Sequence, residues 1–196
     1  VAAGGGGVVG TDSSTGGGAI RDCVIAGNVA ADGHGGGINL VGGSVINCLV
    51  IGNVASNALN NRDGGGIFSY GATVEHCTVS GNRCGRNGTG VYQDRRANTD
   101  NVLRNSIVWG NMGLTNLVAG NEGGAGAVVQ VYSCVPELSH GVDGNITNAP
   151  NLTADYRTPW YSPCVDAGTN GTVLTDLDGN LRPLDGNMDG SSAPAL

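Results

Sequence analysis

A six-residue pattern, Cys-x-hydrophobic-x-Gly-Asn, recurs along this chain and constrains its fold more than any other feature. Three copies begin with Cys and a fourth begins with Ser; they end at Asn28, Asn53, Asn82 and Asn111, so the spacings are 25, 29 and 29 residues. Periods of this length are typical of solenoids, in which each repeat forms one turn and buries its apolar side only against its neighbours.

A glycine cluster precedes each copy, and a β-branched residue follows the cluster. The four clusters start at Gly5, Gly35, Gly64 and Gly88, and the residues that follow them are Val8, Ile38, Ile67 and Val91. A fifth, looser copy starts near Gly123 and runs to Cys134. Although 37 of the 196 residues are Gly, Gly does not recur at every third position and only six residues are Pro, which excludes collagen.

These repeats predict an all-β fold. Each holds two or three short β-prone runs separated by Gly, Asn, Asp and Ser, and no run has helical periodicity. We therefore expect a single-stranded right-handed parallel β-helix of five to six turns, spaced about 4.8 Å apart. Residues 1–134 are expected to form the repeats of a single domain. Residues 135–196 are expected to be an irregular C-terminal segment that completes the last turn and covers one face.

Alignment of the repeats predicts columns of stacked side chains. The asparagines that end the copies should form an amide ladder at one corner, with hydrogen bonds running along the axis. Small residues should follow that corner, which makes Cys84 a core residue. The inward apolar columns are Ile20, Val45, Val74 and Leu103, and Ile25, Val50, Val79 and Val108.

The six cysteines allow two interpretations. Cys23, Cys48 and Cys77 form either an inward thiol ladder or a column with at least one bridge, although directly stacked Cβ atoms are slightly too far apart for a relaxed disulfide. Cys134 and Cys164 could pair near the C-terminal end, and the sequence leaves that pairing open. No CxxC spacing indicates a metal site.

Strand alternation also predicts an outward apolar face that is too hydrophobic for free solvent. Either the segment 149–165, with Trp160 and Tyr161, or a second protomer should cover it. The residues expected on this self-association face are Val24, Leu49, Ile51, Ile107 and Trp109.

The motifs resemble those of right-handed parallel β-helix proteins with repeats of the polymorphic-outer-membrane-protein type. Residues 17–20 read Gly-Gly-Ala-Ile, and the copies ending in Gly-Asn match a Phe-x-x-Asn signature with Ile or Val in place of Phe. Residues 162–168 and 175–180 are similar to the closing coil of secreted bacterial members. The resemblance implies a secreted or surface-exposed protein with an adhesive or structural role.

Charge and length exclude some functions. The net charge is −7 and all nine basic residues are Arg, so few phosphates could be neutralised and nucleic acid is a poor partner. No apolar run approaches the roughly 18 residues of a membrane-spanning helix. Asp94, Arg95 and Arg96 form the densest charge group but fall in an expected loop, and no Ser-His-Asp or paired-carboxylate pattern emerges. We therefore do not expect an enzyme.

Two further motifs predict sites of modification or binding. Asp185, Asn187 and Asp189 fit the first half of a calcium loop, but the closing twelfth position is Leu196, so a series of Asx turns is the alternative to a structural Ca²⁺. No other cofactor is expected. Four sequons, which chance alone explains, place potential glycosylation at Asn87, Asn145, Asn151 and Asn170.

Three functional hypotheses follow. The first is a non-catalytic extracellular structural subunit that self-associates, head to tail or laterally, into a homopolymer, because residues 1–4 supply no capping helix for the exposed strand edges. The second is a monomeric adhesin or glycan-binding domain with Tyr70, Tyr92 and Trp109 on a grooved outer face. The third, a polysaccharide lyase or hydrolase, is the least favoured.

Overall fold

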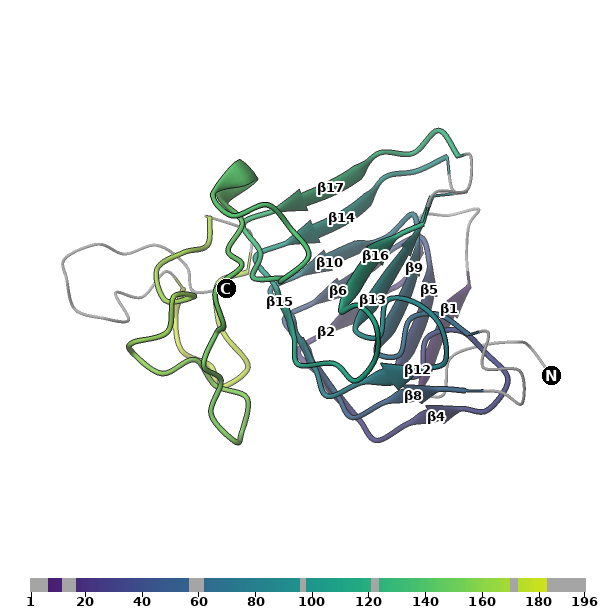
Figure 1. The fold of residues 1–196 in the computed structure, drawn as a ribbon, viewed down its shortest axis with the longest axis horizontal. Coiled ribbons are helices and arrows are strands. Elements are labelled where there is room, and N and C mark those ends of the chain that lie inside the picture. Colours follow the sequence, from purple (N-terminus) through teal and green to yellow (C-terminus); the bar gives the residue numbers. More distant parts are fainter. Residues whose placement is uncertain are drawn as a thin grey trace.

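The structure, a computed structural model, describes residues 7–11, 17–56, 62–95, 98–120, 124–169 and 173–182. Within these ranges the fold is all-β apart from one short 3-10 turn, Val142–Gly144. All paired strands run parallel and stack turn upon turn as a β-solenoid (Figure 1). No described segment forms a helix of the length and apolar character that a membrane span requires.

Each of the first three turns contributes one strand to each of four sheets, whereas the sequence predicted two or three strands in a repeat. Sheet A contains β1 (Val8–Thr11), β5 (Ile38–Val41), β9 (Ile67–Tyr70), β13 (Val91–Asp94) and β16 (Leu117–Ala119). Sheet B contains β2 (Ala19–Arg21), β6 (Ser44–Ile46), β10 (Thr73–Glu75), β14 (Asn101–Arg104) and β17 (Val128–Val131). Sheet C contains β3 (Val24–Ala26), β7 (Leu49–Ile51), β11 (Thr78–Ser80) and β15 (Ile107–Trp109). Sheet D contains β4 (Val29–Ala30), β8 (Val54–Ala55) and β12 (Arg83–Cys84).

The strand register confirms the predicted columns. Val74 pairs with Val45 and Leu103 in sheet B, and Val79 pairs with Val50 and Val108 in sheet C. All six are fully buried, because alternation along each strand turns them into the shared core. The solenoid makes about four turns with a fifth begun by β16 and β17, so the prediction of five to six turns is slightly too high.

Glycine makes the close stacking of the turns feasible at the corner before sheet A. A Cβ on Gly36 would lie 2.3 Å from the carbonyl oxygen of Gly65, and one on Gly65 would lie 2.3 Å from that of Thr89. These clashes are with backbone, so no side chain can move aside to relieve them. The recurrent glycine clusters therefore mark positions where one turn rests directly on the next.

The predicted amide ladder is present at the corner between sheets C and D. In each step, an Asn side-chain oxygen accepts the backbone N–H and the side-chain amide of the Asn one turn earlier, at 2.9–3.0 Å. The ladder also has two rungs that the repeats do not predict. Asn116 accepts from Asn111, and the Glu137 carboxylate accepts from Asn116.

The cysteine column differs from the prediction at one end. Cys48 and Cys77 are buried, whereas Cys23, expected in the same inward ladder, is exposed on the first turn of the described chain. Cys84 is buried and pairs with Ala55, which confirms it as a small core residue. All six cysteines are thiols in the structure.

Beyond β17 the chain leaves the sheets and forms the C-terminal segment, residues 135–169 and 173–182. It lies beside sheet C, next to β15, as an irregular path of turns (Figure 1). Cys134 joins it to the solenoid through isolated bridges to Ile107 and to Ile146. Because this segment packs over the outer face of sheet C, it decides which part of that face remains accessible.

Candidate functional site

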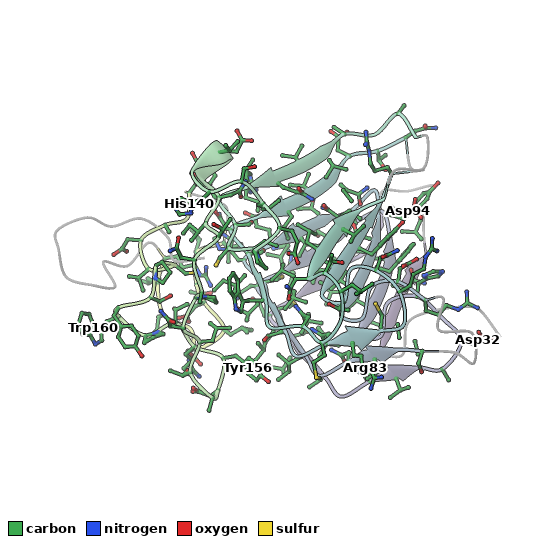
Figure 2. The ribbon with its side chains drawn as sticks, in the orientation of Figure 1. Asp32, Arg83, Asp94, His140, Tyr156 and Trp160 are labelled. Carbon is green, nitrogen blue, oxygen red and sulfur yellow. The ribbon has the colours of Figure 1, made fainter. Side chains whose placement is uncertain are left out.

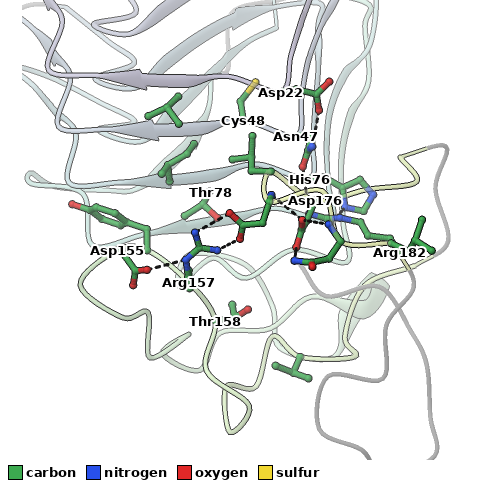
Figure 3. A pocket seen from close by; sticks show the side chains of 18 of the residues that line it. Asp22, Asn47, Cys48, His76, Thr78, Asp155, Arg157, Thr158, Asp176 and Arg182 are labelled. Carbon is green, nitrogen blue, oxygen red and sulfur yellow. Dashed lines mark hydrogen bonds and ion pairs between the residues drawn. The ribbon is translucent and has the colours of Figure 1, made fainter.

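A groove of about 600 Å³ lies between the outer face of sheet C and the C-terminal segment (Figure 3). Its floor is formed by the outward side chains Val24, Leu49 and Thr78 of three successive turns. One wall is the corner between sheets B and C, and the opposite wall comes from residues 155–182. The groove therefore runs across the turns where the repeats meet the C-terminal segment.

The corner wall is a column of residues with left-handed backbone. Asp22, Asn47, His76 and Asn105 occupy equivalent positions with φ between 48° and 53°. Asn and Asp adopt this conformation most readily among residues other than Gly, which explains their recurrence. The Asn47 side-chain amide donates to the Asp22 carboxylate at 2.6 Å, so the wall is braced along the axis.

The C-terminal segment is attached to this column by two contacts. Asn105 donates its side-chain amide to the Thr169 carbonyl and accepts the Thr169 N–H, both at 2.9 Å. Arg182 donates to Nδ1 of His76 at 2.6 Å and to the side-chain oxygen of Asn47 at 3.4 Å. Both contacts join residues far apart in sequence, so they fix the groove wall in place.

His76 is neutral in this setting. Burial, together with the positive charges of Arg182 and Arg104, lowers its pKa to about 4. Burial also lowers the pKa of Arg182 from its ordinary value. A general base works best with a pKa near the operating pH, and His76 already accepts a hydrogen bond from Arg182. Its geometry suits holding the segment rather than moving protons.

The outer wall is organised by Arg157 and Asp176. Arg157 pairs with Asp155 at 2.8 Å and with Asp178 (Figure 3). One oxygen of Asp176 accepts the backbone N–H groups of Asp178 and Asn180, each at 2.8 Å, which forms an Asx-type turn. These carboxylates are engaged by the fold, and no group of three His, Cys, Asp or Glu in the described part of the chain is arranged to hold a metal ion.

Two aromatic side chains, Tyr156 and Trp160, line the groove. Trp160 lies at its rim, 73 % exposed, in an edge-to-face contact with Tyr161 (Figure 2). Tyr156 lines the groove and also a second cavity of about 320 Å³ against Trp109. The other two aromatic residues expected on an outer groove lie on sheet A: Tyr92 is buried in a stacked contact with Phe68, and Tyr70 is half-buried.

The predicted self-association face is only partly open. Val24 is 62 % exposed, and Leu49, Ile51 and Trp109 are half-buried. Ile107 is fully buried against Cys134 and Cys164, so its assignment to a contact between protomers is wrong. The cover is the C-terminal segment, but Trp160 and Tyr161 point to solvent and do not provide it.

The two thiols left open by the sequence, Cys134 and Cys164, meet beneath this cover. Both are fully buried and pack with Ile107 in one cluster, and the Cys134 thiol donates to the Asn148 carbonyl at 3.3 Å. The neighbouring Cys164 thiol and burial raise the pKa of Cys134, whereas the neighbouring Cys134 thiol lowers the pKa of Cys164.

The predicted modification sites have different surroundings. Asn145 is buried, accepts the Ser133 N–H and donates to the Gln130 carbonyl. Its side chain is therefore not accessible in the folded chain, and its assignment as a glycan acceptor is corrected. Asn87 is half-buried and Asn151 is exposed. The remaining predicted sites, Asn170 and the calcium loop of Asp185, Asn187 and Asp189, lie outside the described residues.

A comparison of the sequence with protein-family models, with curated proteins and with solved structures gives no match. The parallel strand pairing shows a β-solenoid, and the finer resemblance to polymorphic-outer-membrane-protein repeats stays a prediction.

Proposed function

We propose that this protein is an extracellular, non-catalytic binding module that holds a neutral glycan chain in the groove. The observation that carries the proposal is the groove itself, with an apolar floor, walls of amide and carboxylate groups, and an exposed Trp at the rim. Ligand sites typically combine apolar lining with a few placed polar groups. Sugar rings fit this pattern, because their C–H faces pack on aromatic rings while their hydroxyls exchange hydrogen bonds with planar polar groups.

The charge of the groove favours a neutral glycan over an acidic one. Four aspartates and two arginines line it, and His76 is neutral at pH 7. The whole chain adds a net charge of −7. A polymer of uronic acids would therefore be repelled, and the neutral hydroxyl groups of hexose or pentose polymers would not.

The direct test is isothermal titration calorimetry with soluble neutral oligosaccharides, such as cello-, xylo- and manno-hexaose, and with oligogalacturonate as the acidic comparison. We expect one neutral series to bind, and Trp160→Ala to weaken that binding about tenfold, as loss of an aromatic contact predicts. Tyr132→Asn is the matched control, because it removes another partly exposed aromatic residue from a left-handed position that Asn105 fills one turn earlier. Absence of binding by every neutral series, or equal affinity in Trp160→Ala, would refute the proposal.

Lateral self-association is the second candidate, and one observation favours it. Val24 and Val29, on neighbouring strands of the first described turn, are 62 % and 58 % exposed. Adjacent apolar side chains of this exposure mark interaction surfaces, and a second copy of this chain is the occupant we test. Electron microscopy and sedimentation should then reveal assemblies that Ile51→Asp disperses, and a wild-type chain that is monomeric at all concentrations would exclude this candidate.

A further inference from the structure

We propose that Cys134 and Cys164 are the sites of a disulfide bond that ties the C-terminal segment to the last turn of the solenoid. Both side chains are fully buried and pack in one cluster, and the Cys134 thiol donates to the Asn148 carbonyl at 3.3 Å. They belong to one apolar cluster with Ile107, which is the outward residue of β15. The pair thus lies where the cover meets the sheet, and a bond there joins residues 30 positions apart in the sequence.

The backbone on each side of the pair is held in place. Cys134 bridges Ile107 on one side and Ile146 on the other. Cys164 donates its N–H to the Ser162 hydroxyl at 3.2 Å, and that hydroxyl donates to the Pro150 carbonyl at 2.6 Å. The folded backbone therefore holds the two cysteines in one cluster, which is where a bond formed as the segment closes would lie.

The other four cysteines are less suited to a bond. Cys48 and Cys77 occupy equivalent positions on neighbouring turns about 4.8 Å apart, beyond the usual Cβ separation of a disulfide of about 3.8 Å. Their thiols instead donate to the Ile46 and Glu75 carbonyls, each at 3.2 Å. Cys23 is exposed, and Cys84 donates to the Asn87 carbonyl.

The chemistry is a thiol–disulfide exchange with a small disulfide donor of the oxidised glutathione class. The Cys164 thiolate attacks one sulfur of the donor and releases one small thiol, which leaves a mixed disulfide on the protein. The Cys134 thiolate then attacks the Cys164 sulfur and releases the second small thiol. Two electrons pass from the protein to the donor, and the two protein thiol protons leave with solvent or with the released thiols.

Burial determines when this exchange occurs. Neither sulfur is accessible in the folded chain, so the exchange belongs to the folding step in which the C-terminal segment closes over β15. Once formed, the bond is shielded from small reductants by the same packing. Such a bond is expected of a chain that folds in an oxidising compartment.

The test is a peptide map of the whole chain refolded in a mixture of reduced and oxidised glutathione. After denaturation, free thiols are blocked with iodoacetamide and the chain is cut with trypsin. Cys134 falls in peptide 105–157 and Cys164 in peptide 158–196, because proline follows Arg182 and prevents cleavage there. We expect these two peptides to be linked, with a mass two hydrogens below their sum, and the number of blocked thiols to fall from six to four.

Two variants complete the experiment. Cys164→Ser should abolish the linked species, and the matched control Cys23→Ser, which places Ser where the fourth repeat has Ser106, should retain it. Six blocked thiols in the refolded wild type would overturn the proposal, as would a linked species that joins peptide 22–62 to peptide 63–83. Since the wild-type map decides the outcome, the test does not depend on either variant folding.

Discussion

The amide ladder makes a sharp prediction about stability, because its rungs differ in what they support. Asn82 is fully buried at the centre. Its side-chain oxygen accepts the backbone N–H of Asn53 at 2.9 Å and the Asn53 side-chain amide at 3.0 Å, and its own amide donates to the Val50 carbonyl at 2.9 Å. The same amide also donates to the Ser80 carbonyl and to the Asn111 side chain, so Asn82→Ala removes all of these bonds at once and leaves their partners enclosed between turns.

The magnitude follows from those partners. A buried polar group that loses its hydrogen bond costs about 1–3 kcal/mol, so two orphaned donors on Asn53 predict a loss of about 4 kcal/mol in the free energy of unfolding. For a chain of this size that is a fall in Tm of roughly 8–16 °C. Asn28→Ala is the matched control, because half-buried Asn28 donates one side-chain bond to Asn53, and its removal should cost about 1 kcal/mol.

The assay is urea denaturation of both variants and the wild type, followed by circular dichroism, with thermal melts in the same buffer. The reasoning predicts that Asn82→Ala loses about 3 kcal/mol more than Asn28→Ala at an unchanged dependence on urea. Equal losses in the two variants would refute it, because the ladder would then be a consequence of the fold and not a support for it.

Two further perturbations test the stacking and the groove wall. Gly36→Ala should prevent folding or abolish soluble expression, since its Cβ would lie 2.3 Å from a backbone oxygen, whereas Gly18→Ala, whose Cβ would meet nothing within 4 Å, should express normally. Because the folded pKa of His76 is about 4 and the ordinary value is 6.5, the unfolded chain binds this proton first as the pH falls. The contribution of His76 to stability should therefore be present above pH 6.5 and be lost between pH 6.5 and 4, and His76→Asn should flatten that part of a stability–pH profile measured by urea denaturation.

The solenoid could be predicted because the same pattern of apolar, Gly and Asn residues recurs in each repeat. Val50, Val79 and Val108 share a position in the pattern, and a parallel stack must place shared positions above one another. The small error in the number of turns arose where the repeats weaken, after Asn111. The two-residue strands of sheet D escaped prediction because two residues carry no visible alternation.

The groove could not be predicted in the same way, because half of it has no repeat. Nothing in the pattern links His76 to Arg182, which lies 106 residues later in the chain. The contact of Asn105 with Thr169 spans 64 residues, and no sequence pattern predicts it either. The same gap explains two errors: Ile107 and Asn145 were assigned to the surface, and the segment that buries Ile107 obeys no period.

The two ends of the amide ladder are chemically different, and this gives the row of side chains a direction. Every Asn from Asn53 to Asn116 both accepts from the rung before it and donates to the rung after it, so whole turns could be duplicated or deleted between them without changing the rule. Glu137 accepts from Asn116 but has no amide to pass on. Its negative charge faces the positive end of the aligned amide dipoles. A single carboxylate can therefore terminate the ladder whatever the number of turns that precede it.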